Sequence, residues 1–341
     1  MLIALMINGC GGQGEQTQKE TGTTTASQLT GEIRVDGSST VLPISEAVAE
    51  EFKKQHPQTD PKVGKSGTGG GFKKFANGEI DITGASRPIR EDEDKLCREK
   101  GVEYIEIPVA YDALAVVVNK QNDWVDSLTV EELRKIWEPA AERKITSWKQ
   151  VRAGFPDVPL RLFGAGSESG TFDFFTAAIV GKERSIRSDH TGSEDDNILV
   201  QGVTSNRGGL GYFGLAYYEQ NKDTLKLIGV DEGKGKGAVL PSIETVVDGS
   251  YYLARPIFIY VNVKALERPE VAEFVKFYLQ NAEKLTQEVG YVPLPANLYQ
   301  LVMERLEKRV TGSAFGAHGT QVGVKLEDLY RLEQESEKGG N

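Results

Sequence analysis

The stretch IEIPVAYDALAVVVN, residues 105–119, is the longest apolar run of the chain and indicates a central strand that is buried on both faces. It is long enough to cross from one domain into another. A second long run rich in β-forming residues, SYYLARPIFIYVN, covers residues 250–262 and is broken at Pro256. We therefore expect two hinge crossings, with residues 112–254 forming a domain that is inserted into the other.

The rest of the chain is divided accordingly. We expect residues 31–111 and 255–320 to form one discontinuous domain, after a truncated lipoprotein signal and flexible linker at 1–30 and before a C-terminal tail at 321–341. Two domains also suit a length of 341 residues. Strand-like and helix-like segments alternate after residue 30, which predicts an α/β protein with a largely parallel sheet.

The charge balance limits the partners. The chain has 50 acidic and 40 basic residues, a formal net charge of −10. A nucleic acid requires clustered Lys and Arg, so this composition argues against such a partner. Any anion that the chain binds must be held locally, against the overall field.

The N-terminal segment resembles the end of a bacterial lipoprotein signal. The apolar run MLIALMING precedes Cys10, and a polar stretch rich in Gly, Thr and Gln follows it. The basic residues that open a secretory signal are missing, so we expect a truncated or misassigned start. We expect Cys10 to be acylated; the alternative is an incidental cysteine in a frayed terminus. Cys97 would then have no disulfide partner.

Three turns rich in glycine and hydroxyl residues share one pattern. They are DGSSTVLPIS at 36–45, GKSGTGGGFKKF at 64–75 and GAGSESGTFDFF at 164–175. Each follows a predicted strand and precedes a helix, where unpaired amides and the helix dipole favour an anion. One such turn is usually an ordinary helix cap, but three in one chain predict a common anion site.

Two arginines are candidates for neutralising that anion, because a guanidinium makes bidentate contacts with an oxyanion. Arg87 follows the third predicted strand, where strand ends converge on ligands. The alternative for Arg87 is a surface ion pair with the acidic run EDED at 91–94. Arg187 is the second candidate.

Other kinds of chemistry find little support. The segment GAGSESG lacks the frame of a nucleophile elbow, and only three histidines could serve as bases. The glycine-rich segments do not match a phosphate-binding P-loop, and no Cys/His cluster has zinc spacing. The acidic run SEDDN at 193–197 is explained by the start of a helix. We expect no enzyme activity, no cofactor and no metal site.

Taken together, these segments resemble the periplasmic phosphate-binding proteins of bacterial ABC transporters, of the PstS type, and most of all their lipoprotein branch in cyanobacteria. The resemblance is carried by DGSSTVLPI, GTGGGFKKFANGEIDITGASRPI, IPVAYDALAVVVN, LTVEELRKIW, GAGSESGTFDFFTAAI, SEDDNILVQGV and GLGYFGLAYYEQN. It implies a type II periplasmic-binding-protein fold, with two α/β domains on a two-strand hinge closing over phosphate. It also implies a monomer at the periplasm or cell surface, lipid-anchored, that delivers phosphate to a permease and ATPase.

The same resemblance suggests roles for individual residues. In the first turn, Thr40 and the backbone of Val41 would donate to phosphate, with Ser39 adjacent. Thr68 stands where the family has a serine in the second turn. The third turn matches the family's S-G-T with Ser169, Gly170 and Thr171.

Two departures from the family pattern concern charge. Arg87 stands where many members have an aspartate that accepts the proton of phosphate and repels sulfate. Ala165 stands where they have an arginine. We expect Arg87 or Arg187 to supply the positive charge and Asp112 to be the replacement acceptor. Further candidates for the acceptor are Asp36 and Asp173, while Asp112 could instead cap nearby amides at a strand end.

Three alternatives stay open at this point. The same scaffold could bind another oxyanion, such as sulfate, molybdate or arsenate. A phosphate-ester hydrolase would need a base or metal near Ser39 or Ser169, which the sequence does not clearly supply. A phosphate sensor without a transport role has no distinguishing sequence feature.

Overall fold

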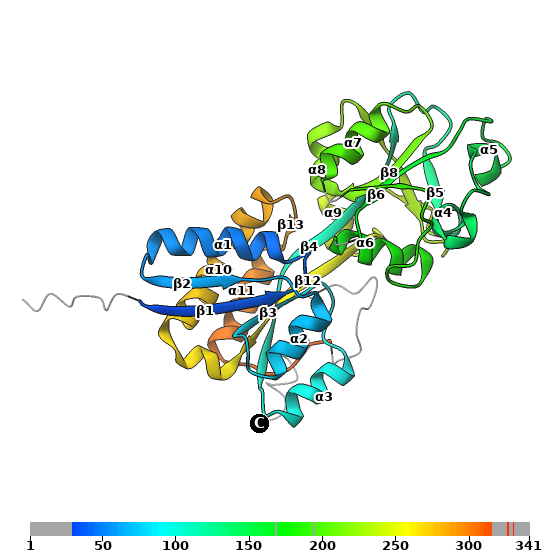
Figure 1. The fold of residues 1–341 in the computed structure, drawn as a ribbon. Helices are drawn as coiled ribbons and strands as arrows, with labels where there is room; N and C mark the ends of the chain where they lie inside the picture. Colours follow the sequence, from blue (N-terminus) through cyan, green and yellow to red (C-terminus); the bar gives the residue numbers. More distant parts are fainter. Residues whose placement is uncertain (1–28, 168, 194, 316–325, 327–329, 331–341) are drawn as a thin grey trace, which may run out of the picture.

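The computed structural model describes residues 29–167, 169–193, 195–315, 326 and 330 and consists of two α/β lobes joined by two long strands (Figure 1). The joining strands are β4 (Tyr104–Asn119) and β12 (Ala254–Asn262). The first lobe adds the strands β1 (Gly31–Gly37), β2 (Thr59–Val63), β3 (Ile82–Ala85) and β13 (Val292–Pro293). Its helices are α1 (Leu42–Gln55), α2 (Thr68–Ala76), α3 (Glu91–Glu99), α10 (Pro269–Glu288), α11 (Ala296–Glu307) and the short 3-10 helix η3 (Val263–Glu267).

The second lobe contains shorter elements. Its strands are β5 (Ser127–Thr129), β6 (Arg161–Ala165), β7 (Thr191–Ser193), β8 (Gly209–Gly214), β9 (Leu225–Leu227), β10 (Gly229–Asp231) and β11 (Ala238–Val239). Its helices are α4 (Val130–Trp137), the 3-10 helix η1 (Pro139–Ala141), α5 (Trp148–Val151), α6 (Gly170–Phe175), the π-helix η2 (Thr176–Val180), α7 (Asp196–Thr204), α8 (Leu215–Asn221) and α9 (Ile243–Val247).

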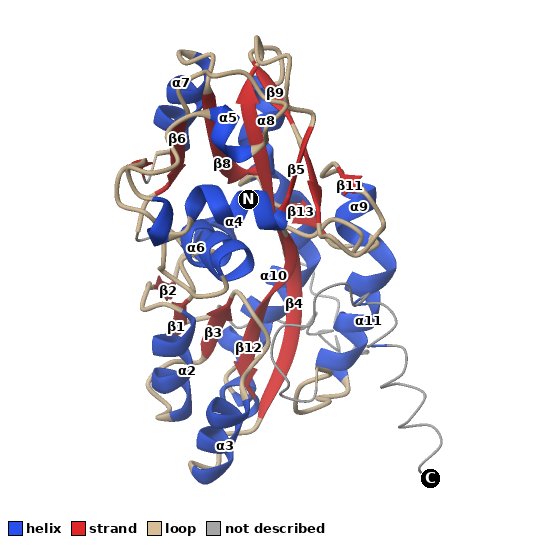
Figure 2. Cartoon of the chain, turned by 90° about the vertical axis from the view of Figure 1, so that its right-hand side faces the viewer, coloured by secondary structure: helices blue, strands red, loops and turns tan. Residues whose placement is uncertain are grey.

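Strand β4 belongs to both lobes and changes partners in its middle (Figure 2). Up to Ala113 it pairs with β12, and from Leu114 onward it pairs with β8 and then β9. All of its residues are buried, as expected for a strand covered on both faces. The partners of β4 change between Ala113 and Leu114, and β12 starts at Ala254; the domain boundaries at residues 112 and 254 stay a prediction.

The main sheet is mixed rather than largely parallel, which corrects the expectation from the sequence. Its order is β2-β1-β3-β12-β4-β8-β6-β7. The outer strands of each lobe pair in parallel, whereas β12 and β4 are antiparallel to each other and to their neighbours β3 and β8. The chain leaves the first lobe along β4 and returns along β12, so the two crossings have to run in opposite directions.

Apolar spacing and capping residues explain the helices next to the hinge. In α1, the buried residues Ile44, Val48 and Phe52 recur every four positions, which places them on one face. Helix α4 starts at Thr129, whose side chain accepts from the amide of Glu132, while Glu132 returns a bond to the amide of Thr129. This capping box fixes the N-cap of α4 at Thr129.

The buried carboxylate of Glu106 anchors the N-terminal part of β4. The Glu106 side chain is fully buried and accepts hydrogen bonds from the hydroxyls of Tyr260, Ser313 and Tyr330 and from the amide of Ala314. Burial raises the pKa of Glu106. These bonds tie the segment after α11 to the hinge strand.

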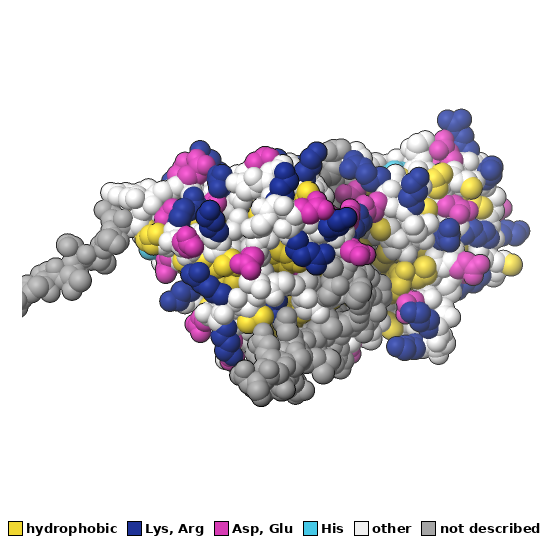
Figure 3. Space-filling view, turned by 90° about the horizontal axis from the view of Figure 1, so that it is seen from below, with side chains coloured by type: hydrophobic (Ala, Val, Ile, Leu, Met, Phe, Trp, Pro, Cys, Tyr) yellow, Lys and Arg dark blue, Asp and Glu magenta, His cyan; other side chains and the backbone are white. Residues whose placement is uncertain are grey.

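No helix among the described residues has the length and hydropathy needed to cross a bilayer. On the face drawn in Figure 3, Lys and Arg side chains are interspersed with Asp and Glu, and no continuous basic surface is seen. This face lacks the electrostatic feature that nucleic-acid binding requires.

Candidate anion-binding site

A cavity of about 300 Å³ lies between the lobes beside the hinge strands. Both lobes line it, and it brings together six of the residues predicted from the sequence: Ser39, Thr40, Asp112, Ser169, Gly170 and Thr171. The lining also includes polar residues that the sequence did not single out, namely Lys65, Asp196, Tyr217 and Tyr291. The first and third hydroxyl turns therefore line one space, whereas the second turn contributes Lys65 but not Thr68, so the common site of all three turns stays a prediction.

A buried ion pair lies directly behind this cavity. Arg255 is opposite Asp112 in the register of β12 and β4, so the two side chains lie on the same face of the sheet. The Nε and Nη2 atoms of Arg255 are 3.3 and 3.2 Å from Oδ2 of Asp112. Their exposed fractions are only 8% and 2%. The pair places a guanidinium at the point where the two lobes meet.

Arg255 also contacts both lobes. Its Nη2 atom donates to Oγ1 of Thr40, at 3.3 Å, and to the carbonyl of Gly170, at 3.1 Å. Its guanidinium lies 4.2 Å from the ring centre of Phe174 in the second lobe. Within the described part of the chain, no hydrogen bond uses its Nη1 atom. Arg255 is not among the residues that line the cavity, so it lies behind the lining and holds Thr40 and Gly170 of the two turns in place.

Only one of the two carboxylate oxygens of Asp112 takes part in this ion pair. Both contacts from Arg255 go to Oδ2, and no hydrogen bond within the described residues uses Oδ1. Burial raises the pKa of Asp112, and the charge of Arg255 opposes this shift without cancelling it. Because the residue lines the cavity, Oδ1 is an acceptor that a protonated ligand oxygen could reach.

In the first turn, the backbone is partly committed to its own fold. The amide of Thr40 donates to Oγ of Ser38 at 3.2 Å, and the amide of Val41 donates to the carbonyl of Ser38 at 3.2 Å. Val41 is buried and is not among the lining residues. Its amide, expected from the sequence as a donor to the anion, is therefore already bonded in this structure. The side chains of Ser39 and Thr40 remain at the cavity.

The third turn caps α6. Ser169 precedes the helix, and its Oγ accepts from the amide of Thr171 at 3.1 Å. Gly170 lies against the first lobe: a Cβ built on it would come within 1.7 Å of Oγ1 and 3.0 Å of the amide nitrogen of Thr40. The two turns are thus in direct contact, which only glycine at position 170 permits.

This close approach predicts that Gly170→Ala keeps the lobes apart. We expect phosphate affinity to fall roughly 10- to 100-fold, since inserting a methyl group into a packed contact costs ~1–3 kcal/mol. Isothermal titration calorimetry measures the loss. Gly69→Ala is the matched control, because its added Cβ would have nothing nearer than 3.9 Å. Equal phosphate affinity in the two variants would show that closure does not need the contact.

The other predicted residues lie away from the cavity. Thr68 starts α2, and its hydroxyl lies 3.1 Å from that of Ser86. Arg87 forms a bidentate ion pair with Glu93, at 2.8 and 2.7 Å, which is the alternative that the sequence left open. The structure corrects the expected position of the positive charge, because Arg87 is already neutralised in the first lobe.

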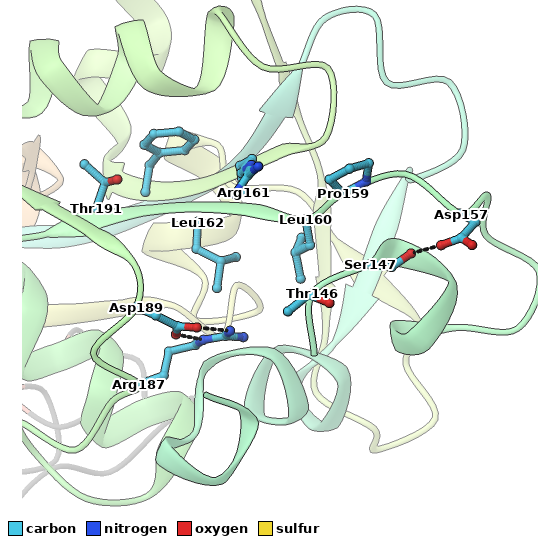
Figure 4. Close-up of a pocket in the computed structure, with 11 residues that line it drawn as sticks. Thr146, Ser147, Asp157, Pro159, Leu160, Arg161, Leu162, Arg187, Asp189 and Thr191 are labelled. Carbon is cyan, nitrogen blue, oxygen red and sulfur yellow. Dashed lines mark hydrogen bonds and ion pairs between the residues drawn. The ribbon is translucent and has the colours of Figure 1, made fainter. Parts of the chain in front are cut away.

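Arg187 lines a different cavity of about 560 Å³ within the second lobe, where its guanidinium points to Asp189 (Figure 4). It contacts Asp189 through two nitrogens, at 2.5 and 2.8 Å, and donates to the carbonyls of Ile136 and Ile145. It is 3% exposed. These bonds show that Arg187 holds loops of the second lobe together, so it does not supply charge to the cavity between the lobes.

The two reserve carboxylates are also placed elsewhere. Asp36 accepts from Ser66 and Lys74, at 2.7 and 2.6 Å, and these bonds outweigh burial to lower its pKa. Asp173 lies 3.9 Å from Arg184 and is not among the residues that line the cavity. Among the three candidate acceptors, Asp112 alone lines the cavity. No group of three or more metal-ligating side chains occurs in the described residues.

Arg255 is the residue that the sequence interpretation missed. The signal was present, because Arg255 directly precedes the break at Pro256 in the second run and Asp112 stands at the predicted domain boundary in the first. Pairing the runs as antiparallel strands would have placed the two charges opposite each other. The expectation of a largely parallel sheet hid that register.

Known proteins share this architecture. Residues 18–282 match the PBP superfamily domain. The chain is 54% identical over 302 residues to protein SphX of Synechococcus elongatus, which covers 88% of each chain. It is 41% identical over 281 residues to the phosphate-binding protein PstS of Staphylococcus haemolyticus, with 82% of this chain and 86% of the relative covered. The chain belongs to the PstS-type branch of the PBP superfamily.

Solved structures agree with this PstS-type assignment. A possible phosphate-binding protein from Planctomyces limnophilus is 48% identical, with a TM-score of 0.76, and the match covers 83% of this chain and 99% of that chain. An ABC-type phosphate transport receptor from Vibrio cholerae is 26% identical, with a TM-score of 0.62, covering 77% and 100%. The type II periplasmic-binding-protein fold expected from the sequence is therefore confirmed.

Proposed function

We infer that the protein is an extracytoplasmic solute-binding protein that captures inorganic phosphate between its lobes and delivers it to an ABC permease and ATPase. The observation that most supports this function is the carboxylate of Asp112, which lines the cavity between the lobes. Its Oδ2 atom is paired with Arg255, whereas its Oδ1 atom has no hydrogen bond within the described residues. The names of the PstS and SphX relatives support the same conclusion.

The proposed mechanism is closure of the lobes around a dehydrated anion. Hydroxyls of Ser39 and Thr40 come from the first lobe, and those of Ser169 and Thr171 come from the second. They replace water around the phosphate oxygens, and the N-terminal ends of α1 and α6 add partial positive charge. Arg255 supplies a positive charge: burial lowers the pKa of its guanidinium, Asp112 opposes this shift, and a guanidinium remains protonated in proteins.

Selectivity against sulfate follows from the ion pair. Phosphate retains a proton at neutral pH, and Oδ1 of Asp112 can accept it. Sulfate has no proton to offer, so its oxygen would face a carboxylate lone pair. The adjacent Arg255 keeps Asp112 from being an isolated buried charge, which makes a carboxylate acceptable inside an anion site.

Other oxyanions are the principal alternative, and a hydrolase is disfavoured. No histidine is among the residues that line the cavity in the described part of the chain. Two carboxylates, Asp112 and Asp196, do line it, but Asp112 is paired with Arg255, and the described residues contain no group of three or more metal-ligating side chains that could activate a nucleophile. We further propose a monomer attached to the membrane through acylated Cys10, which lies outside the described residues.

Isothermal titration calorimetry of the ligand-stripped protein tests the function. We expect tight binding of phosphate and no heat with sulfate, at equal concentrations and at pH 8. Arsenate should bind, because it has the shape and protonation of phosphate. Sulfate binding as tight as phosphate binding would make the protein a general oxyanion receptor, and silence with every anion would refute the proposal.

A further inference from the structure

Asp112 has a neighbour on each side of β4. Strand β13 pairs with β4 so that Val292 is opposite Tyr111 and Pro293 is opposite Ala110. Continuing this antiparallel register by one residue places Tyr291 opposite Asp112. On the other side of β4, Arg255 is opposite Asp112. Cross-strand neighbours project from the same face, so the three side chains form a row across the hinge.

Tyr291 lines the same cavity as Asp112. The charges that act on it most are those of Asp112 and Arg255. No hydrogen bond joins the hydroxyl of Tyr291 to another described residue. The hydroxyl also keeps some contact with solvent, since it is not among the fully buried polar atoms that lack a partner. Burial raises the pKa of Tyr291, so the hydroxyl stays protonated and able to donate at any physiological pH.

The backbone before Tyr291 fixes its position. Gly290 has a φ of 88°, in the left-handed region that favours glycine, and the amide of Tyr291 donates to the carbonyl of Thr286 at 3.0 Å. A Cβ on Gly290 would come within 2.8 Å of the Cβ of Ala216 in α8. The turn of the first lobe therefore lies tightly against the second lobe, and Tyr291 stands at that junction.

Tyr291 also separates two spaces. Besides the cavity, it lines a more apolar groove of about 680 Å³ between α8, α9 and the end of α10. The aromatic ring could therefore serve only as a wall between the cavity and the groove. Separating the two spaces requires the ring but not the hydroxyl, so the hydroxyl calls for an explanation of its own.

We propose that Tyr291 is a further anion-binding residue, whose hydroxyl donates a hydrogen bond to a phosphate oxygen on the hinge side of the cavity. This inference rests on the proposed function. A phenol is a neutral donor, so it strengthens the binding of any oxyanion in the cavity. Asp112, in contrast, distinguishes anions by their proton. Tyr291 should therefore affect the affinity for every oxyanion, whereas Asp112 should affect the selectivity among oxyanions.

Tyr291→Phe removes the hydroxyl and keeps the ring as a wall. We expect ~10-fold weaker phosphate binding by calorimetry, equivalent to about 1.4 kcal/mol, as for a hydrogen bond to a charged ligand. Thermal unfolding of the unliganded protein should be unchanged. Tyr218→Phe is the matched control, because Tyr218 is a partly buried phenol of α8 that does not line the cavity.

The same substitution in an Asp112→Asn background provides the second readout. Phosphate and sulfate affinities should fall by the same factor, because a neutral donor does not distinguish the two anions. Phosphate affinity of Tyr291→Phe within ~2-fold of the parent protein, well below the effect of one charged hydrogen bond, would overturn the proposal and leave Tyr291 as a wall. An unequal effect on the two anions would also overturn it, by showing that the hydroxyl serves residue 112. A parent protein that binds no phosphate would instead refute the proposed function.

Discussion

Arg255→Gln should reduce phosphate affinity more than any other single change, by at least ~100-fold. The substitution removes the one buried guanidinium behind the described cavity and leaves the carboxylate of Asp112 buried without a partner. Truncating one partner of a buried, hydrogen-bonded charge pair at a binding site costs ~2–5 kcal/mol of binding free energy, and 1.4 kcal/mol corresponds to a tenfold change in affinity. Calorimetry with phosphate measures the effect.

Thermal unfolding separates a binding defect from a folding defect in this variant. The double variant Arg255→Gln with Asp112→Asn removes both charges, so it should regain much of the stability that Arg255→Gln loses but should not regain phosphate binding. Arg87→Gln is the control, since Arg87 is neutralised by Glu93 away from the cavity. If Arg255→Gln bound phosphate within a few-fold of the parent, Arg255 would have only a structural role.

Asp112→Asn should abolish the discrimination between phosphate and sulfate. We expect phosphate affinity to fall ~10- to 100-fold, in line with the ~1.5–3 kcal/mol of a hydrogen bond to a charged group, while sulfate becomes a measurable ligand. An amide can turn its NH₂ group toward an oxyanion, so it no longer repels sulfate. Competition calorimetry with both anions gives the ratio of the two affinities.

The pH dependence of this ratio tests the acceptor role of Asp112. Its pKa is raised by burial, so lowering the pH protonates the carboxyl earlier than an ordinary aspartate. A protonated Asp112 cannot accept the proton of phosphate, and selectivity in the parent protein should decrease as the pH falls through the raised pKa. The ionisation of free phosphate is the same in experiments with both proteins. Comparing the parent protein with Asp112→Asn at each pH therefore separates the titration of Asp112 from that of phosphate. A ratio that changes identically in both would contradict the acceptor role.

Local patterns in the sequence predicted much of the fold. The apolar run at 105–119 is the buried strand that joins the lobes, and the hydroxyl turns at 36–45 and 164–175 meet at one cavity. These features depend on residues close together in the sequence: burial of a strand, and a turn that precedes a helix. The family resemblance added the order of the elements and the S-G-T match at Ser169.

The charges of the site were harder to predict, because ion pairing is decided by contacts far apart in the chain. Arg255 is separated from Asp112 by 143 positions, and their encounter depends on the antiparallel register of β12 and β4. The guanidinium of Arg87 is suited to binding an anion, but Glu93, six positions away, neutralises it. Arg187 is bound by Asp189 in the same way. For each of these two arginines, a nearby carboxylate was available, and the structure favours it over a distant ligand.

The place where β4 changes partners also has a mechanical consequence. If the lobes close by rotating about the two joining strands, as the proposed mechanism requires, displacement grows with distance from those strands. Arg255 and Asp112 are paired residues of β12 and β4, so such a rotation would move them little. Ser169, Gly170 and Thr171, at the start of α6, would move with the second lobe. In the proposed closure, the charged pair would therefore keep its place while the hydroxyls of the second lobe approach the anion.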